Sequence, residues 1–247
     1  MKDRIIKLEY SVSTCLFASL AVLFFFVLLN SFVDNTLRMC NPMTGVGFTI
    51  TKLGNYVGLF AGFIAYVLTL GLMLFPRVRH NIDWFMKFTH ELTHTLVALL
   101  FFGKIREFVV RDRECYVSYQ TGPVGYVPIT LSPYCIPIYT FMLFPFRFAG
   151  DNKYLIAFDF LIAFSYAFHI HTVIKQTSFS QPDIANCGKA RSVAFITFVH
   201  LWVLSLVLAT PRAGVINALC RVCYEYPMKL LSDLSGWFVG IFGCIIG

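Results

Sequence analysis

The sequence has few charged residues for its length. Asp, Glu, Lys and Arg together make up 13% of the 247 residues, whereas about a quarter is usual in a soluble domain. Hydrophobic residues make up 57%, and aromatic residues, including 27 phenylalanines, make up 17%. A surface of this kind suits contact with lipid and with other helices better than contact with water. The shortage of charge excludes an ordinary soluble domain and predicts an all-α polytopic membrane protein.

Acidic residues are scarcer than basic ones, and the formal net charge is +7. The Lys and Arg residues cluster in the short connections between apolar runs. In a membrane protein such residues set the topology and contact lipid headgroups. We therefore predict that the lipid bilayer is a partner and that nucleic acid is not.

A disulfide framework is also missing. The eight cysteines are scattered along the chain, and Cys220 and Cys223 form the only close pair in the sequence. That pair has no neighbouring histidine or second cysteine pair, so it is a weak metal or redox signal. We expect these two cysteines to serve helix packing.

Long apolar runs, in contrast, are abundant. Four clean runs reach about the 20 residues that a hydrocarbon core requires, and they cover residues 11–33, 53–75, 154–174 and 192–210. A further run, Leu131–Phe148, contains three prolines, so we expect a kinked or broken span there. The first run is too long for a signal peptide and lacks a small-residue cleavage site, so we expect it to be retained. With a run that begins at Trp84, these segments predict about six transmembrane helices.

We interpret residues 1–247 as one integral membrane domain, with two N-terminal spans in 11–76, a core over 83–210 and an interfacial or weakly apolar tail over 211–247. Between Lys104 and Thr130, short β-prone runs alternate with turn residues. This pattern predicts a small membrane-associated β-hairpin within the core.

One motif in the sequence carries specific chemistry. His90, Glu91 and His94 form the pattern H-E-x-x-H inside an apolar run that extends to Phe102. On a helix, residues four apart lie on one face, so both imidazoles can bind one metal ion while the glutamate stands beside it. The motif predicts a Zn²⁺ site in which His90 and His94 are ligands and Glu91 is the general base.

The expected depth of the motif supports this interpretation. Asp83 is a suitable N-cap, and a helix that starts there places the two histidines about two turns, or roughly 10 to 16 Å, from its beginning. A charged group at bilayer depth costs roughly 2.5 to 3.5 kcal/mol. A purely structural role for these polar side chains is therefore the less favoured interpretation.

A catalytic zinc ion needs about three protein ligands, and the sequence offers several candidates for the third. Asp159 lies inside an apolar run, where a lone carboxylate requires a partner. Asp183 lies in a polar loop, and His169 or His171 is a further alternative. If every span crosses the bilayer, Asp159 lies on the same side as the start of the motif helix and Asp183 on the opposite side. A half-crossing through the proline-bearing run reverses this conclusion, so both aspartates stay open.

Five segments between the motif and about Phe198 form a larger pattern. They are Thr89-His-Glu-Leu-Thr-His, the strand entry Gly103-Lys-Ile-Arg, the Gly122 turn, a proline-bearing span and Gln181-Pro-Asp-Ile. This pattern resembles the site-2 protease family of intramembrane zinc metallopeptidases, in particular its small uncharacterised bacterial branch. The resemblance implies that His90, His94 and Asp183 bind Zn²⁺ and that Glu91 activates water. It also implies a multi-pass protein of the bacterial cytoplasmic (inner) membrane that hydrolyses transmembrane protein substrates.

The sequence departs from that family at two places. Thr93 stands where a glycine usually precedes the second histidine, and its hydroxyl can bond to the carbonyl of Thr89. The family's Leu-Asp-Gly signature is absent. The alternatives to a zinc endopeptidase are an inactive homologue that binds membrane partners and a transporter with a His/Asp relay.

Overall fold

The computed structural model describes residues 55–225 apart from 112–113, 122–124 and 179, together with 228, 232 and 235. The described chain is mostly helical and carries one small antiparallel sheet, as the sequence predicts. It divides into two compact units, and Val57–Ile196 contains every candidate site residue. The first predicted span, residues 11–33, lies outside the described residues.

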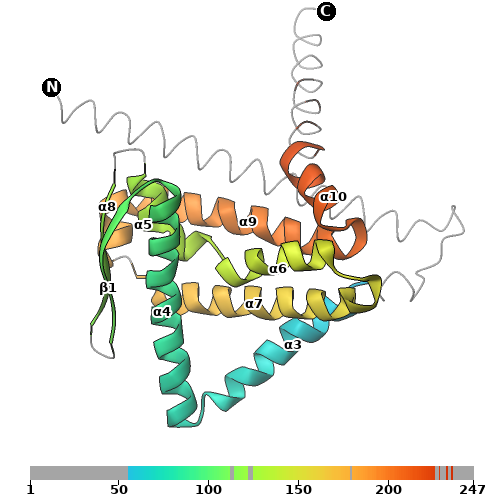
Figure 1. Cartoon of the computed structure of the whole chain (residues 1–247), viewed down its shortest axis with the longest axis horizontal. Coiled ribbons are helices and arrows are strands. Elements are labelled where there is room, and N and C mark those ends of the chain that lie inside the picture. Colours follow the sequence, from blue (N-terminus) through green and yellow to red (C-terminus); the bar gives the residue numbers. More distant parts are fainter. Residues whose placement is uncertain are drawn as a thin grey trace, which may run out of the picture. The chain divides into compact units, whose positions relative to one another are not determined.

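Figure 1 shows the elements, which are described here in chain order. They are α3 (Val57–Leu72), α4 (Pro76–Leu100), β1 (Lys104–Val110), β2 (Cys115–Gln120), α5 (Tyr126–Cys135), α6 (Ile138–Ala149), the 3₁₀ turn η2 (Asn152–Tyr154), α7 (Leu155–Gln176), α8 (Pro182–Cys187), α9 (Lys189–Ala213), α10 (Val215–Cys220) and the π-helical turn η3 (Arg221–Glu225).

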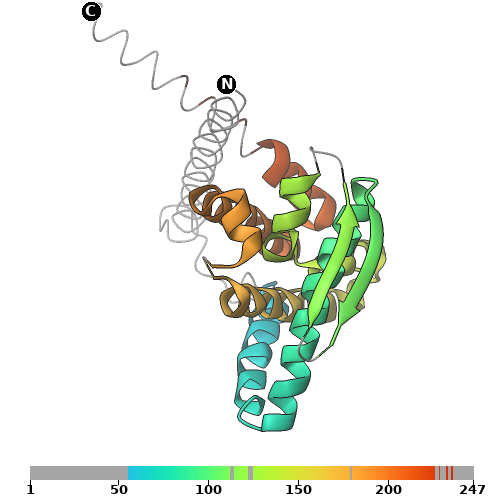
Figure 2. The same cartoon turned by 90° about the vertical axis from the view of Figure 1, so that its left-hand side faces the viewer.

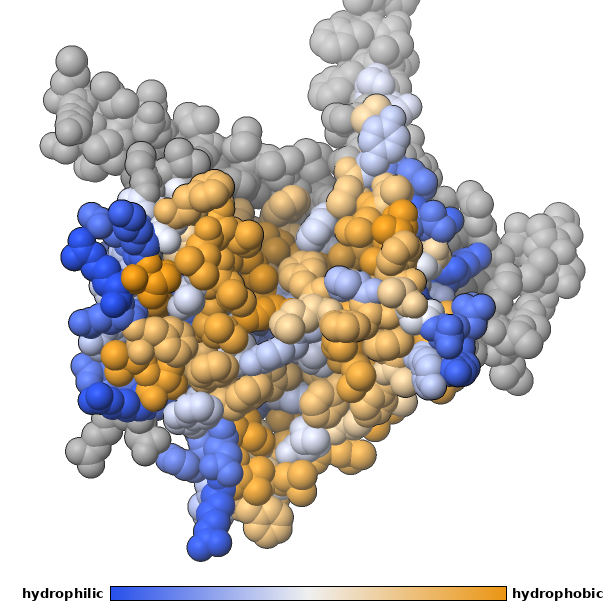
Figure 3. All heavy atoms as spheres, in the orientation of Figure 1, coloured by the Kyte–Doolittle hydropathy of each residue, from blue (hydrophilic) through white to orange (hydrophobic). Residues whose placement is uncertain are grey.

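Two helices in the described part of the chain are long and apolar enough to cross a membrane, namely Asn152–Gln176 and Lys189–Ala213. The bent pair α5 and α6 would make a third span, and α3 is a shorter apolar helix. Apolar side chains cover much of the face that α3, α6 and α7 present in Figure 3, whereas hydrophilic side chains gather along the hairpin. The six-span arrangement stays a prediction, because part of it falls on residues that are not described.

The helix that carries the motif begins earlier than the sequence predicts. Pro76 occupies its first turn and Phe75 is its N-cap, so the expectation that Asp83 caps this helix is wrong. A proline suits the first turn because its missing N–H would have no helical partner there. The histidines therefore lie about four to five turns into α4 rather than two. Asp83 instead forms an ion pair with Lys175 at the end of α7.

The predicted hairpin is confirmed, and a tight turn delivers the chain into it. Phe102 adopts a positive φ of 56°, and the N–H of Gly103 donates to the carbonyl of Ala98 at 2.7 Å. These are the bonds of a Schellman cap, in which the left-handed residue satisfies the last carbonyls of a helix. A Cβ on Gly103 would lie 2.9 Å from that carbonyl oxygen, so only glycine fits here without adjustment. The turn folds the hairpin back along α4, as Figure 2 shows.

A small core then fixes the hairpin and α5 against the C-terminal half of α4. Val97 and Ala98 pack with Ile129 of α5, and all three are at most 5% exposed. Ile105 of β1 and Tyr119 of β2 pack against this cluster from the hairpin. The register of the two strands, for example Ile105 opposite Tyr119, places both residues at this core. The core therefore holds β2 close to the motif.

The proline-bearing run is broken into two helices, as predicted, and the bent pair can form either one broken span or a re-entrant loop. Its two halves, α5 and α6, are bent by 76° at a break around Ile136 and Pro137. Proline has no N–H and disfavours a helical conformation in the residue before it, so a helix readily ends at this point. Because of the bend, α5 follows a different direction from α6 and contacts α4 and α8.

Helices α3 and α7 approach each other closely through glycines. A Cβ on Gly62 would lie 2.1 Å from the carbonyl oxygen of Phe160, and one on Gly58 would lie 2.5 Å from that of Ile156. Small residues four apart allow such backbone contact between helices in an apolar environment. This packing anchors α7, whose last residue reaches the candidate site.

In the second compact unit, the described residues beyond Thr197 form the rest of α9, α10 and η3. Cys220 and Cys223 lie there with free thiols, and both are exposed. The packing role expected for this pair is therefore not found within the described residues.

Candidate metal centre

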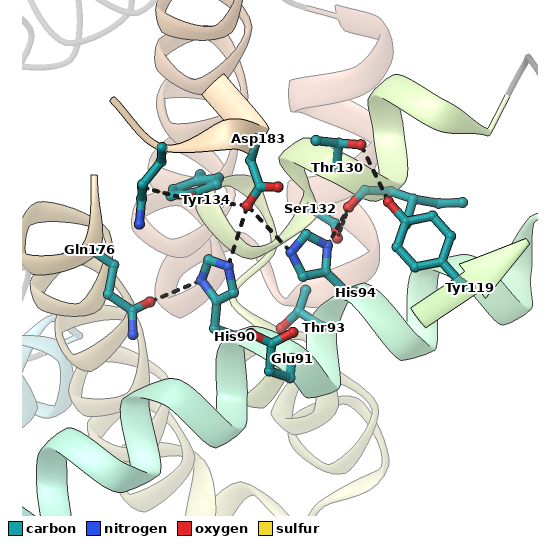
Figure 4. A network of polar contacts seen from close by, with 12 residues as sticks. His90, Glu91, Thr93, His94, Tyr119, Thr130, Ser132, Tyr134, Gln176 and Asp183 are labelled. Atoms are coloured by element: carbon teal, nitrogen blue, oxygen red, sulfur yellow. Dashed lines mark hydrogen bonds and ion pairs between the residues drawn. The ribbon is translucent and has the colours of Figure 1, made fainter. Parts of the chain in front are cut away.

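Three side chains converge in the compact unit Val57–Ile196. Nε2 of His90 and Nε2 of His94 each lie 3.6 Å from Oδ2 of Asp183. Figure 4 shows the two imidazoles rising from α4 toward the carboxylate, which comes from α8. Among the described residues, this is the one group of three or more metal-ligating side chains close enough to hold one ion.

The local structure explains why these atoms meet. The spacing of four residues places both imidazoles on one face of α4, and their rings stand at 75° with centroids 5.0 Å apart. Asp183 lies in the first turn of α8, the short helix between α7 and α9. The bent α5 packs against both α4 and α8, so it bridges the elements that carry the ligands.

The hydrogen bonds of the two imidazoles point their lone pairs at the centre. Nδ1 of His94 lies 2.8 Å from the carbonyl oxygen of Ile129, which can only accept, so Nδ1 carries the hydrogen. Nδ1 of His90 lies 3.0 Å from Oε1 of Gln176, and the same assignment follows. In the neutral imidazoles both Nε2 atoms are therefore acceptors. Three acceptors facing one point need a positive charge between them, which a proton or a metal ion can supply.

The spacing of the three atoms fits a metal ion. For metal–donor distances of about 2.0 to 2.2 Å and tetrahedral angles, two donors lie roughly 3.3 to 3.6 Å apart. The two histidine–aspartate distances are 3.6 Å, and all three ligand atoms lie within 4.8 Å of one another. The two histidine–aspartate pairs already have this spacing, and the two imidazole nitrogens would need only to approach each other to within it. Two nitrogens and one carboxylate oxygen form a donor set that zinc favours, and they leave a fourth position open.

Asp183 is the more accessible member of the group. Its side chain is 30% exposed, compared with 12% for His90 and 6% for His94. Burial by itself raises the pKa of the Asp183 carboxyl, whereas imidazoles that carry a proton on Nε2 lower it more strongly, through hydrogen bonds and charge. A metal ion in place of that proton would likewise favour the ionised carboxylate, which is the form that binds a metal.

Glu91 lies beside the group, on the helix that carries both histidines. Its side chain is buried, and it lies close enough to His90, His94 and Asp183 to interact with them electrostatically. The backbone of Val117 in β2 also lies near its carboxylate. A carboxylate next to the open position of a metal site is placed to take a proton from water.

Comparison with protein-family models, with curated proteins and with solved structures finds no match for this chain. The site-2 protease resemblance therefore rests on the residues alone. The distances among His90, His94 and Asp183 do not depend on similarity to another protein, because they are measured between side chains of this chain.

The structure places the other candidate ligands elsewhere. Asp159 accepts hydrogen bonds from Arg147 at 2.5 Å and 3.2 Å, and both residues are buried. Nδ1 of His171 lies 2.7 Å from the hydroxyl of Tyr66 in α3. His169 is buried on α7 and is not part of the group around Asp183. These contacts fit roles in helix packing, and they do not form a second cluster around the motif.

Sequence reasoning missed three groups that support the site. They are the carbonyl of Ile129, the amide of Gln176 and the hydroxyl of Tyr134, which lies 3.3 Å from Oδ2 of Asp183. In the sequence, a glutamine at the end of an apolar run and a tyrosine in a proline-bearing run are only weak indications of a role near the metal ligands. One predicted contact is confirmed, because the hydroxyl of Thr93 donates to the carbonyl of Thr89 at 2.7 Å.

Proposed function

We propose that this protein is a zinc-dependent endopeptidase of the membrane that hydrolyses peptide bonds in membrane-spanning substrates. The observation that carries the proposal is the convergence of His90, His94 and Asp183, with Glu91 beside them on α4. Two structural features support it further. The ligands have hydrogen-bonded supports, and the helices around them include two that are apolar and long enough to cross a membrane.

Zinc is the metal that this donor set favours. Imidazole nitrogens suit zinc better than magnesium or calcium, which prefer oxygen ligands alone. When bound, the ion would act as a Lewis acid that polarises a carbonyl and lowers the pKa of water to about 7. His90, His94 and Asp183 would hold it and leave its fourth position to water or substrate.

Glu91 performs the proton transfers in this proposal. Its carboxylate takes a proton from the attacking water and later delivers it to the amine that leaves when the peptide bond breaks. The buried position of Glu91 keeps competing water away from that carboxylate. Its place next to His90 in the chain fixes its distance from the ligands through the helix itself.

The hairpin supplies a surface for an extended substrate. Strands β1 and β2 pair only with each other within the described sheet, so each has an outer edge, and Val117 of β2 lies near Glu91. An added strand would form backbone hydrogen bonds with such an edge and would expose its peptide bonds, which a helix shields. Proline substitutions along both strands should then reduce cleavage, and unchanged cleavage would refute this part of the proposal.

The apolar surface of the described helices suggests the setting of the reaction. Exposed side chains such as Phe63 and Leu68 on α3 and Phe146 on α6 suit contact with lipid. We propose a multi-pass arrangement with about six spans in the bacterial cytoplasmic (inner) membrane. Transmembrane proteins within the same bilayer are the substrates that such an enzyme would meet.

Metal content is the first test of the proposal. We expect purified full-length protein in detergent to hold one zinc ion per chain, as measured by inductively coupled plasma mass spectrometry. His90→Ala and His94→Ala should each remove it, whereas His80→Ala, a change of the same residue type in the first turns of α4, should not. Protein that holds no metal after purification in zinc-containing buffer would refute the proposal.

Cleavage is the second test. Metal-loaded protein should cut a library of fluorogenic peptides with transmembrane-like sequences, and Glu91→Gln should cut them far more slowly. Zinc-loaded protein that cuts none of them but retains membrane proteins would favour the alternative of an inactive homologue that binds partners. The relay transporter has less support, because Asp159 pairs with Arg147 and His171 with Tyr66.

A further inference from the structure

Tyr134 occupies a special position between the broken span and the metal centre. It lies in the last turn of α5, one residue before the helix ends, and its side chain is 1% exposed. Its hydroxyl donates toward Oε1 of Gln181 at 2.8 Å and toward Oδ2 of Asp183 at 3.3 Å. A buried hydroxyl without partners is unfavourable, so these two oxygens fix the direction of the phenol.

The segment that carries Asp183 has limited means of positioning its own carboxylate. Helix α8 has six residues, and a helix of that length is unstable in isolation. Its apolar anchors, Ile184 and Cys187, are at most 1% exposed and hold the backbone in place. The contacts that reach the aspartate carboxylate come from other elements, namely from the two imidazoles of α4 and the hydroxyl of Tyr134 in α5.

The hydroxyl of Tyr134 restricts the rotation of that carboxylate. Its one hydrogen is shared between Oε1 of Gln181 at 2.8 Å and, at 3.3 Å, Oδ2 of Asp183, the same oxygen that faces Nε2 of both histidines. A carboxylate oxygen has two lone-pair directions. If Tyr134 occupies one of them, the other is directed at the point between His90 and His94, where the cation would lie.

Tyr134 also contacts the histidine side of the site. Its ring stands edge-on to the ring of His90 at 85°, with centroids 5.3 Å apart. In Figure 4 the phenol lies next to both Asp183 and His90. The break after α5 makes this possible, because the chain bends away at Pro137 and leaves the end of α5 against α8.

We propose that Tyr134 is a positioning residue that fixes the orientation of Asp183 for metal binding. The inference rests on the proposed metal site and extends it to a residue outside the ligands. Partners of this kind, which hold a ligand in its binding orientation, typically change metal affinity by about 10- to 100-fold when they are removed. The phenol proton is shared with Oε1 of Gln181, which competes with Asp183 for it.

The test compares two tyrosine-to-phenylalanine changes. Zinc affinity of the full-length protein in detergent is measured by competition with a chromophoric chelator. Tyr134→Phe should weaken zinc binding by about 10- to 100-fold. Tyr139→Phe is the matched control, because its hydroxyl lies 3.2 Å from that of Thr89, which is not a proposed ligand. The control should bind zinc within about twofold of the parent protein, and a Tyr134→Phe protein that does the same would overturn the proposal.

A general loss of structure has a different signature. A positioning role predicts that Tyr134→Phe leaves the melting temperature of the metal-free protein close to that of Tyr139→Phe and changes the visible spectrum of the Co²⁺-substituted protein. It also predicts that Tyr134→Phe has little further effect in an Asp183→Asn background, because the two changes remove one interaction. An equal loss of affinity in both backgrounds would show a structural role and would overturn the proposal.

Two further results separate this inference from the proposed function. If the parent protein binds no zinc, the proposed function fails first. If the parent binds zinc and Tyr134→Phe does not yield folded protein, Gln181→Met provides the test. Removal of the competing acceptor releases the phenol proton to Asp183, so zinc affinity should be equal to or tighter than that of the parent. A loss of tenfold or more would overturn the proposal.

Discussion

Asp159 and Asp183 carry the same side chain in opposite electrostatic settings. Asp159 meets Arg147 across the interface of α6 and α7, and both side chains are 4% exposed. Asp183 meets two imidazoles whose hydrogens are directed elsewhere, and its side chain is 30% exposed. An arginine is cationic at any physiological pH, so the protein itself balances Asp159. Neutral histidines cannot balance Asp183.

The difference teaches how to distinguish a structural carboxylate from a candidate ligand. A buried carboxylate that pairs with an arginine has its charge balanced within the chain, and this pairing indicates a structural role. An acid that faces the lone pairs of two histidines is incomplete without a cation. Both aspartates were candidate third ligands in the sequence, and the partner that each one finds in the structure separates them.

The largest expected effect comes from replacing each of the two aspartates, one at a time, with asparagine. Asp183→Asn removes a negatively charged ligand, so the protein should lose its zinc during purification and stop cleaving peptides, while the two histidines keep only a weak zinc affinity that chelator competition can still measure. Asp159→Asn should leave the zinc content unchanged, because its carboxylate contacts Arg147 and no histidine of the motif. Metal analysis of the two purified variants provides the measurement. Zinc loss from Asp159→Asn alone would reverse the comparison.

Glu91→Gln tests the metal-centre side of the comparison between Asp183 and Asp159. The amide has the shape of the carboxylate but cannot accept the proton from water, so cleavage should fall by about 10²- to 10⁴-fold. Zinc content should not change, because Glu91 is not a proposed ligand. The measurement pairs the rate of peptide cleavage with metal analysis on the same preparation. A variant that still cleaves at the parent rate would remove Glu91 from the mechanism.

Asp159→Ala tests the other side of the comparison, the buried ion pair with Arg147. It leaves the buried guanidinium of Arg147 without its partner, which should lower the free energy of unfolding by about 3 to 5 kcal/mol. The double replacement Arg147→Met with Asp159→Leu removes both charges and should restore most of that loss. Denaturant titrations in mixed micelles would measure both variants. If the double replacement were as unstable as the single one, the ion pair would not explain the effect.

Sequence reasoning predicted the parts of this fold that depend on local chemistry. The hairpin, the break in the proline-bearing run and the Thr93 bond to Thr89 are confirmed, because proline, turn residues and threonine act on their own neighbours in the chain. The predicted N-cap of α4, Asp83, lies eight residues after the observed one, Phe75. Both Pro76 and Asp83 are suitable near a helix start, and the helix begins at the earlier one and runs on through Asp83, whose carboxylate pairs with Lys175.

The sequence could not show which aspartate completes the metal site, because the answer depends on the topology of the chain. Whether Asp159 or Asp183 reaches the histidines depends on the direction of the chain after the prolines, and no local pattern gives the angle of a bend. The 76° bend between α5 and α6 accompanies the arrangement in which Asp183 meets the motif. Its role as a ligand stays a prediction until a metal is measured.

The smallest expected effect concerns the supports of the two histidines, which differ in kind. His94 donates to the backbone carbonyl of Ile129, which no side-chain change removes, whereas His90 donates to the side chain of Gln176. Gln176→Ala should therefore free the ring of His90 and weaken zinc binding by about tenfold. Gln176→Glu keeps an acceptor and adds charge, so its affinity should equal or exceed that of the parent. Chelator competition on both variants measures the effect. If alanine and glutamate gave the same affinity, the hydrogen bond would not orient His90, and the backbone contact of His94 would be the more important support of the pair.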